Sequence, residues 1–218
     1  MDYCVIGSGS KGNAVVIGGK ILIDCGMPYK HIAPHAGGLN LVLLTHIHSD
    51  HFKPRTAAAL HRDRPALRWG ACEWMARPLI DAGVDMRQID IFQPDGPAYS
   101  YSLSPEKWVK ISPISLHHDV KNCGYKVHFS DGQRLFYATD TGYLDDIHAP
   151  GFDLYMIEAN HGEMEIQQRI QQKESQGKYP YEKKAMLYHL SKEQAAAWLA
   201  REAGPQSQYV FLHGHVDE

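Results

Sequence analysis

The sequence predicts an α/β fold in which short β-strands are interspersed with helices. Short apolar runs of β-compatible residues recur along the chain, for example at residues 39–44 and 153–158. Helix-compatible segments lie between such runs, and one of them follows a capping-box pattern made by Ser191 and Gln194. With 218 residues, 44% of them hydrophobic, the chain is long enough for a full core. We therefore expect one globular domain over residues 1–218.

The first half of the chain opens with a predicted β-hairpin. Residues 3–6 and 14–17 are β-like and flank a glycine-rich loop that matches the dinucleotide-binding pattern G-x-G-x-x-G. The loop leads into a second hairpin, residues 14–17 and 20–23 around Gly18 and Gly19, and not into the helix that a dinucleotide site needs. We therefore exclude dinucleotide binding. A buried strand at 39–44 and helices at 54–62 and 70–82 are predicted to follow.

The second half begins with a turn-rich connector at 94–105, followed by a β-like run at 108–114. Residues 125–129 and 134–139 alternate around a Ser-Asp-Gly turn, which predicts a hairpin. A buried strand is expected at 153–158, a polar helix at 162–177, a helix at 195–203 and a last strand at 208–212.

The strongest chemical signal is the segment Thr45-His46-Ile47-His48-Ser49-Asp50-His51, directly after the apolar run at 39–44. Side chains two apart in extended backbone point the same way, so His46 and His48 can bind one metal ion. Asp50 and His51 follow in a turn and can face a second ion. Imidazole nitrogens and carboxylate oxygens are ligands that borderline divalent metals such as zinc accept. The segment predicts half of a two-metal hydrolytic site, and a histidine-rich surface loop is the alternative.

Two further strand ends carry candidate residues. Asp24 ends the strand at 20–23, where a carboxylate can accept the second N–H of a ligating histidine; a plain turn carboxylate is the alternative. His117 and His118 end another β-like run. Because adjacent side chains on a strand point to opposite faces, only one of these two histidines should join the site.

The H-x-H-x-D-H pattern is similar to the signature of the metallo-β-lactamase superfamily. Six further stretches resemble its small YycJ-type branch, which is related to RNase Z and RNase J: residues 7–13, 23–26, 118–125, 139–143, 158–161 and 189–191. The resemblance covers nearly the whole chain. It implies a metallo-β-lactamase-like αββα four-layer sandwich, in which two mixed β-sheets are flanked by helices.

The resemblance also implies seven ligands for two divalent metal ions, with Zn²⁺ expected and Mn²⁺ as the alternative. It places His46, His48 and His118 on one ion, Asp50, His51 and His213 on the other, and Asp140 between them. Without the other motifs, the Asp-Thr-Gly sequence that begins at Asp140 would instead indicate an ordinary turn. His118 matches the family's H-D pattern, so His117 is expected to be packed or solvent-facing. For the last position the chain offers two histidines, and we assign His213 because it is nearest the strand end, with His215 as the alternative.

The implied reaction is hydrolysis by a metal-bound hydroxide, with Asp50 and His189 as catalytic residues. In the phosphodiesterase branches that the H-L-S pattern of 189–191 resembles, the histidine usually does not bind the metal. It assists the leaving group or steadies the charge of the transition state, which is the role expected of His189. No role for His161 follows from the sequence.

The expected function is that of a phosphodiesterase or exonuclease acting on DNA or RNA. A small-molecule hydrolase of a cyclic phosphodiester, lactone or thioester is the alternative, and a non-catalytic metal-binding protein is a third class. Five basic residues between positions 53 and 68 would suit a phosphate-bearing substrate, although such charge can also be a solvated helix face. A flavin-linked di-iron oxidoreductase is not expected, because those sites usually replace the second histidine with glutamate.

Composition sets further limits. No stretch reaches transmembrane length and no signal peptide is visible, so we expect a cytoplasmic protein without a membrane partner. A secreted β-lactamase is not expected, because an export signal is not visible and that group does not use the bridging aspartate. The formal charge of −3 argues against a generally basic nucleic-acid coat. No C-x-x-C pair occurs, so free thiols are expected at the four cysteines, which are Cys4, Cys25, Cys72 and Cys123. The oligomeric state stays open.

Overall fold

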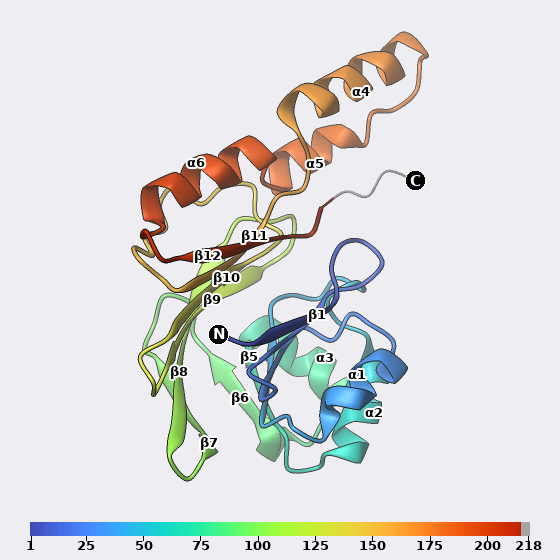
Figure 1. Ribbon diagram of the computed structural model, residues 1–218. Helices are drawn as coiled ribbons and strands as arrows, with labels where there is room; N and C mark the ends of the chain where they lie inside the picture. The colour runs from blue at the N-terminus through green and yellow to red at the C-terminus, as the bar shows by residue number, and fades with distance from the viewer. Residues whose placement is uncertain (215–218) are drawn as a thin grey trace.

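Two six-stranded sheets face each other in a computed structural model of the protein, which describes residues 1–214 (Figure 1). The first sheet is formed by the first half of the chain and its strands follow the chain order. They are β1 (Tyr3–Gly7), β2 (Ala14–Ile17), β3 (Ile21–Ile23), β4 (Leu41–Leu44), β5 (Arg68–Cys72) and β6 (Ile89–Phe92). The sheet is mixed, since β1 to β3 pair antiparallel and β3 to β6 pair parallel.

The second sheet is formed by the second half of the chain, in the order β12-β11-β10-β9-β8-β7. Its strands are β7 (Tyr99–Ser104), β8 (Lys107–Leu116), β9 (Asn122–Phe129), β10 (Arg134–Ala138), β11 (Leu154–Glu158) and β12 (Gln208–Leu212). The strands from β7 to β10 pair antiparallel, and β10, β11 and β12 pair parallel.

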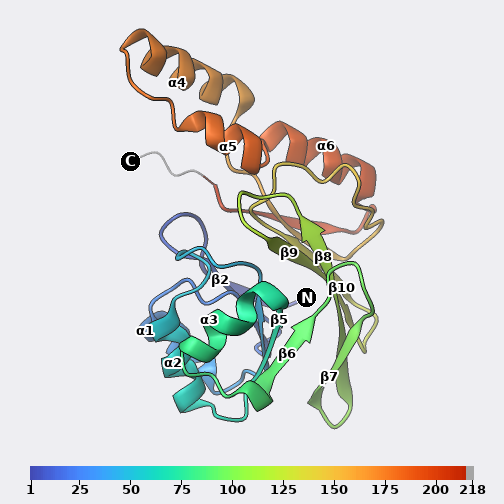
Figure 2. The ribbon, with the colours of Figure 1, turned by 180° about the vertical axis from the view of Figure 1, so that it is seen from behind.

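Helices cover the outer face of each sheet (Figures 1 and 2). The first sheet carries α1 (Tyr29–Ala36), α2 (Pro54–Asp63), α3 (Ala76–Asp81) and the short 3₁₀ helices η1 (Glu73–Met75) and η2 (Met86–Gln88). The second carries α6 (Lys192–Glu202), while α4 (Glu163–Ser175) and α5 (Glu182–Tyr188) form a hairpin that projects from the body. The predicted capping box begins α6, because Ser191 accepts from the backbone of Gln194 and Gln194 accepts in return. The four-layer αββα sandwich is confirmed.

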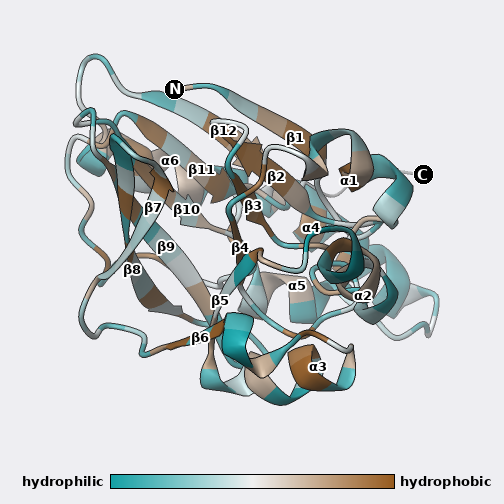
Figure 3. Ribbon diagram, turned by 90° about the horizontal axis from the view of Figure 1, so that it is seen from below, coloured by the Kyte–Doolittle hydropathy of each residue, from teal (hydrophilic) through white to brown (hydrophobic). Residues whose placement is uncertain are grey.

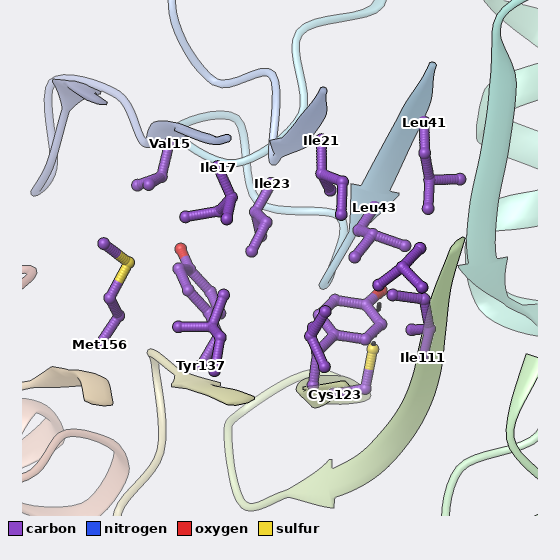
Figure 4. Packing of buried hydrophobic residues seen from close by; sticks show 14 of the residues in the cluster. Val15, Ile17, Ile21, Ile23, Leu41, Leu43, Ile111, Cys123, Tyr137 and Met156 are labelled. Carbon is purple, nitrogen blue, oxygen red and sulfur yellow. Dashed lines mark hydrogen bonds between the residues drawn. The ribbon is translucent and has the colours of Figure 1, made fainter. Parts of the chain in front are cut away.

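The core between the sheets is apolar and consists of strand residues from both halves of the chain. Ile17, Ile23 and Leu43 of the first sheet face Ile111 and Tyr137 of the second (Figure 4). Further apolar clusters fill the two spaces between sheet and helices, and apolar segments gather along the strands (Figure 3). Burial of this surface, at about 25 cal/mol per Å² of apolar area, holds the sheets together. No helix among residues 1–214 has the length and apolar character needed to cross a membrane.

Two sequence predictions are wrong in detail. The segment 70–82 was expected to be helical, but residues 68–72 form β5, because Gly70 and its neighbours are buried between β4 and β6. The connector at 94–105 contains β7, which pairs with β8 along the sheet edge. No element was predicted from the sequence at α1, β6 or α5. The four cysteines are free, as expected.

The carboxyl ends of several strands meet at one edge of the sandwich. β3 and β4 run parallel in the first sheet, and β8, β10, β11 and β12 share one direction in the second, since β9 is antiparallel to both β8 and β10. Residues that directly follow these strands therefore come close together. In open α/β sheets this is the edge at which ligands bind.

Candidate metal centre

A first group of histidines joins the two sheets. His46 and His48 follow β4, and His118 follows β8. The Nδ1 atom of His48 lies 3.2 Å from Nε2 of His118, and one nitrogen from each of the three rings lies within 4.8 Å of the others. Two nitrogens bound tetrahedrally to one zinc ion are about 3.3 Å apart. The spacing of these rings therefore suits a shared cation.

A second group lies beside the first and also joins the two sheets. It consists of Asp50 and His51 from the loop after β4 and His213, which follows β12. The Oδ2 atom of Asp50 is 3.4 Å from Nε2 of His213 and 3.7 Å from Nε2 of His51. His215, the alternative to His213, lies outside the described residues.

Asp140 stands between the two groups. Its Oδ2 atom is 2.9 Å from Nε2 of His51, and its Oδ1 atom is 3.4 Å from Nε2 of His213 and 3.9 Å from Nε2 of His118. The Oδ1 atom thus lies near a ring nitrogen of each group, a position that suits a ligand shared by two ions. The structure brings all seven of the predicted ligands together.

Backbone conformation helps to aim these side chains. Asp24, Asp140 and His213 each follow a strand end with φ of 61°, 59° and 52°. Residues other than glycine rarely adopt this left-handed region, and such outliers gather at functional sites. Here the turn redirects the chain at the end of β3, β10 and β12, so that the side chain points across the edge of the sandwich.

His46 provides the clearest sign that a cation belongs here. Its side chain is fully buried, and its Nε2 atom has no hydrogen-bond partner. Burial, together with the neighbouring imidazole of His51, holds the pKa of His46 far below its usual value, so the ring is neutral. A buried acceptor without a partner costs about 1–3 kcal/mol. A metal ion bound to this lone pair would remove that cost.

Hydrogen bonds behind the rings fix which nitrogen faces the centre. The Nδ1–H of His51 donates to Oδ2 of Asp24 at 2.7 Å, which is the contact predicted for Asp24. His46 donates through Nδ1 to the Thr45 hydroxyl at 3.0 Å, and that hydroxyl donates to Asp24 at 2.9 Å. One buried carboxylate therefore orients two rings with Nε2 toward the centre, an arrangement typical of metal-binding histidines.

Two more rings, those of His118 and His213, are oriented in the same way from the second sheet. His118 donates from Nδ1 to the backbone carbonyl of Tyr188 at 3.2 Å. His213 donates from Nδ1 to Oε1 of Glu158, also at 3.2 Å. All four rings thus direct Nε2 toward the centre, as metal-binding histidines do when a neighbouring acceptor holds the other ring N–H.

The charge in the cluster supports the same conclusion. Burial lowers the pKa of His51, but the carboxylates of Asp140 and Asp24 overcome this and raise the pKa to about 10. Burial likewise raises the pKa of Asp140, while His51 and His213 hold it well below its usual value. These carboxylates therefore favour positive charge between them. Divalent ions would supply it and leave the imidazoles neutral, as metal ligands need to be.

Glu158, at the end of β11, is a site residue that the sequence analysis missed. Its side chain is fully buried. Its Oε1 atom accepts from Nδ1 of His189 at 2.5 Å as well as from His213, and its Oε2 atom accepts from the backbone N–H of Thr141 at 3.0 Å. Glu158 therefore positions both the candidate ligand His213 and the candidate catalytic residue His189, whose rings stack at 5.3 Å. In the sequence, the sign that could have indicated this role is a glutamate at the end of an otherwise apolar strand.

Glu158→Gln is expected to lower metal affinity and hydrolytic activity by about 10- to 100-fold each. The amide keeps the size of the side chain but can no longer accept from both imidazoles with a full negative charge. Competition with a metal-chelating dye and steady-state kinetics measure the two effects. The exposed Glu106→Gln is the matched control, and a Glu158→Gln protein with the affinity and activity of that control would contradict this positioning role.

The glycine-rich loop at 7–13 packs against the second group of candidate ligands, Asp50, His51 and His213. The side-chain amide of Asn13 lies 2.8 Å from Nε2 of His51 and 3.3 Å from Oδ2 of Asp50, and the Ser8 hydroxyl accepts from the backbone N–H of His213. Gly26 lies against the same segment so closely that a Cβ there would be 1.6 Å from the Asp50 carbonyl oxygen. The sequence analysis assigned no role to Asn13 or Ser8, because their partners are distant in the chain.

Other candidates from the sequence lie outside the cluster. His117 is exposed and stacks on Tyr143, as expected of the histidine that does not join the site. His161 lines a cavity of about 350 Å³ between α4 and α5, together with Arg169, Lys173, Lys192 and two glutamates. Asp119 was missed and lies 3.4 Å from Nε2 of His48.

The basic segment after the histidine motif is largely structural. Lys53 donates to the carbonyl of Gly26, and Arg64 donates to carbonyls at the end of α1. Arg68 pairs with Asp90. Three of the five cations are thus engaged in holding the fold, and only Arg55 and Arg62 stand exposed on α2. Because these three side chains already have partners within the protein, the segment is less suited to bind a phosphate-bearing substrate than the sequence suggested.

The αββα fold and this set of donors define a metal-dependent hydrolase. The chain belongs to the β-lactamase superfamily, since the model of the family described as "Beta-lactamase superfamily domain" matches residues 20–213.

Two curated bacterial proteins are similar along nearly the whole chain. Exodeoxyribonuclease YycJ of Bacillus anthracis is 22% identical over 236 residues, covering 97% of this chain and 81% of that protein. Exodeoxyribonuclease WalJ of Streptococcus pneumoniae is 27% identical over 239 residues, covering 99% and 81%.

Solved structures share the fold. The metallo-β-lactamase fold protein YhfI of Bacillus subtilis superposes with a TM-score of 0.69 at 18% identity, covering 99% of this chain and 87% of that one. The short form of human tRNase Z gives 0.67 at 16% identity, covering 98% and 92%.

Proposed function

We propose that this protein is a nuclease that hydrolyses phosphodiester bonds of DNA or RNA with two bound divalent metal ions. His46, His48 and His118 would hold one ion, Asp50, His51 and His213 the other, and Asp140 would bridge them. The convergence of inward-facing imidazoles on the unpartnered Nε2 of His46 carries this proposal. When bound, such ions supply a nucleophile from water near neutral pH and neutralise charge on the phosphate. Because both groups draw on both halves of the chain, we also propose that the chain acts as one domain.

His189 is the candidate for assisting the leaving group. The Nδ1–H of His189 donates to Glu158, which fixes the orientation of the ring. The Nε2 atom is then the one that can exchange a proton with a substrate oxygen. The ring stacks on His213, its Nδ1 lies 3.6 Å from Asp140, and its side chain is 19% exposed. It thus lies beside the proposed ligands and remains open to a substrate. Asp50 would contribute at the same place by holding the second ion.

A nucleic acid is favoured over a small ester as the substrate. Both curated relatives are described as exodeoxyribonucleases and align over nearly the whole chain. The cavity beside Asn160 adds Arg169, Lys173 and Lys192 near the site, although two glutamates share its lining. Zn²⁺ and Mn²⁺ both suit the donor set, and Zn²⁺ is our first choice because five of the seven proposed ligands are imidazoles.

Metal-dependent cleavage of nucleic acid tests this function. The protein, loaded with Zn²⁺ or Mn²⁺, is expected to shorten 5′-phosphorylated single-stranded DNA, duplex DNA or structured RNA, and excess chelator should abolish the cleavage. Asp140→Ala, purified in parallel, is the control against a contaminating nuclease and is expected to be inactive.

Inactivity of a metal-loaded protein on all three polymers would contradict the nuclease assignment. Hydrolysis of a cyclic phosphodiester, lactone or thioester by the same preparation would then establish the small-molecule alternative.

A further inference from the structure

An exposed pair of aromatic rings lies next to the proposed metal centre. The rings of His117 and Tyr143 stack with centroids 5.0 Å apart and planes 28° from parallel, and 46% of Tyr143 is exposed. Tyr188 extends the pair, with its ring 6.0 Å from His117. We call these three residues the aromatic platform. None of them has a role in the site described so far except for the backbone carbonyl of Tyr188.

Each residue of the platform lies within three positions in the sequence of a residue of the candidate site. His117 precedes the candidate ligand His118, and Tyr188 precedes His189. Tyr143 is three residues beyond Asp140, on the same loop. Tyr188 also contacts the ring of His118 edge to face at 6.0 Å. The platform therefore borders the His46, His48 and His118 side of the centre.

Hydrogen bonds hold the platform in place. The backbone N–H of His117 donates to the Thr141 hydroxyl at 3.2 Å, and that hydroxyl donates to the carbonyl of Tyr143 at 2.9 Å. The N–H of Gly142 donates to the carbonyl of His117 at 2.8 Å. A Cβ on Gly142 would lie 2.2 Å from the carbonyl oxygen of Leu187, so the loop is packed directly against the end of α5. The backbone that carries Tyr143 is thus fixed relative to Asp140, and the stack on His117 orients its ring.

A rigid, exposed aromatic face beside a hydrolytic centre suits an unpaired base. Every nucleobase has a π-face, and base–aromatic stacking strengthens the binding of single strands without selecting a sequence. A base inside a duplex is stacked on its neighbours and cannot use such a face until it is released. The exposed Leu187 beside Gly142 adds apolar surface at the same place.

We propose that the aromatic platform stacks the base of a nucleotide next to the scissile phosphate, so that the enzyme acts on unpaired ends of nucleic acid. This inference rests on the proposed nuclease function and adds the substrate class to it. Tyr143 is then a positioning residue for the substrate, with His117 supporting its ring. A small phosphodiester without a base would gain nothing from the platform.

Oligonucleotides that lack a single base test the proposal. The substrates are single-stranded 5′-phosphorylated oligodeoxyadenylates in which an abasic residue replaces the first or second nucleotide from either end. For the wild-type protein, one of these replacements is expected to lower kcat/KM for terminal cleavage by about tenfold, mainly through KM. In Tyr143→Ala the intact substrate should show the same loss, and the abasic replacement should then have no further effect.

Variants separate stacking from a structural role. Tyr143→Phe and Tyr143→Trp should keep the preference for the intact base, and Tyr209→Ala, which removes an exposed tyrosine on β12, should change nothing. Metal content and thermal midpoint of Tyr143→Ala are expected to match the wild type. A wild-type protein that cleaves intact and abasic substrates equally well, or a Tyr143→Ala protein that keeps the base preference, would overturn the platform while leaving the nuclease assignment in place. Failure to cleave any oligonucleotide would remove both.

Discussion

Asp50→Ala is expected to bind one divalent ion where the wild type binds two, and to lose hydrolytic activity by on the order of a thousandfold. Asp50 supplies the carboxylate of the group that contains His51 and His213, and its Oδ2 atom lies 3.4 Å from Nε2 of His213. Without it, two imidazoles and the shared Asp140 remain for the second ion. A catalytic metal contributes several kcal/mol to the transition state, and each 1.36 kcal/mol is a factor of ten in rate.

Elemental analysis of the purified protein and initial rates on a cleavable substrate measure these effects. Asp146→Ala, which removes an exposed carboxylate three residues beyond Tyr143, is the control for the loss of an acidic side chain. Full activity in Asp50→Ala, or two ions still bound, would contradict the two-metal arrangement.

Gly26→Ala is expected to lower the free energy of unfolding by about 3 kcal/mol or more, with a fall of roughly 10 °C in the thermal midpoint. The added Cβ would lie 1.6 Å from the carbonyl oxygen of Asp50 and 2.8 Å from the amide nitrogen of His51. Both atoms belong to backbone, so the loop that carries these two ligands must move. Loss of the second metal ion should accompany the loss of stability.

Gly37→Ala provides the matched control for this substitution. Gly37 has φ of −57° and ψ of −31°, which alanine adopts without strain, and no atom lies within 4 Å of its Cβ position. Its stability should equal or slightly exceed that of the wild type, because alanine restricts the unfolded chain. Thermal unfolding with and without chelator distinguishes the two variants. Equal midpoints for them would show that the contact between Gly26 and Asp50 does not constrain the loop.

Positions at strand ends explain why so much of the centre was predictable from the sequence. His46, His118 and His213 follow apolar runs, and the run and the turn after it are visible in the sequence. The resemblance to a known family then indicated which of the residues in these turns form one metal site. Glu158 escaped this reasoning because its role depends on His189 and His213, which lie far along the chain and meet it only in the folded protein.

The errors in secondary structure have a similar cause. Residues 68–72 form β5 because their neighbours in space are β4 and β6, and packing at Gly70 is so tight that a Cβ there would lie 2.3 Å from the Phe92 ring. The predicted helix at 70–82 begins only at Glu73, and Gly70, a poor helix former, lies in the strand before it. The basic residues between 53 and 68 likewise looked available for a substrate until their carbonyl and carboxylate partners were seen.

The division of ligands between the two sheets has a consequence for a severed chain. β6 ends at Phe92 and β7 begins at Tyr99, so a cut between them would yield one fragment per sheet. The N-terminal piece would retain His46, His48, Asp50 and His51, and the C-terminal piece would retain His118, Asp140 and His213. Neither fragment would contain all the proposed ligands of either metal ion. Their reassembly should therefore depend on divalent metal, which would make the pair a metal-triggered complementation system.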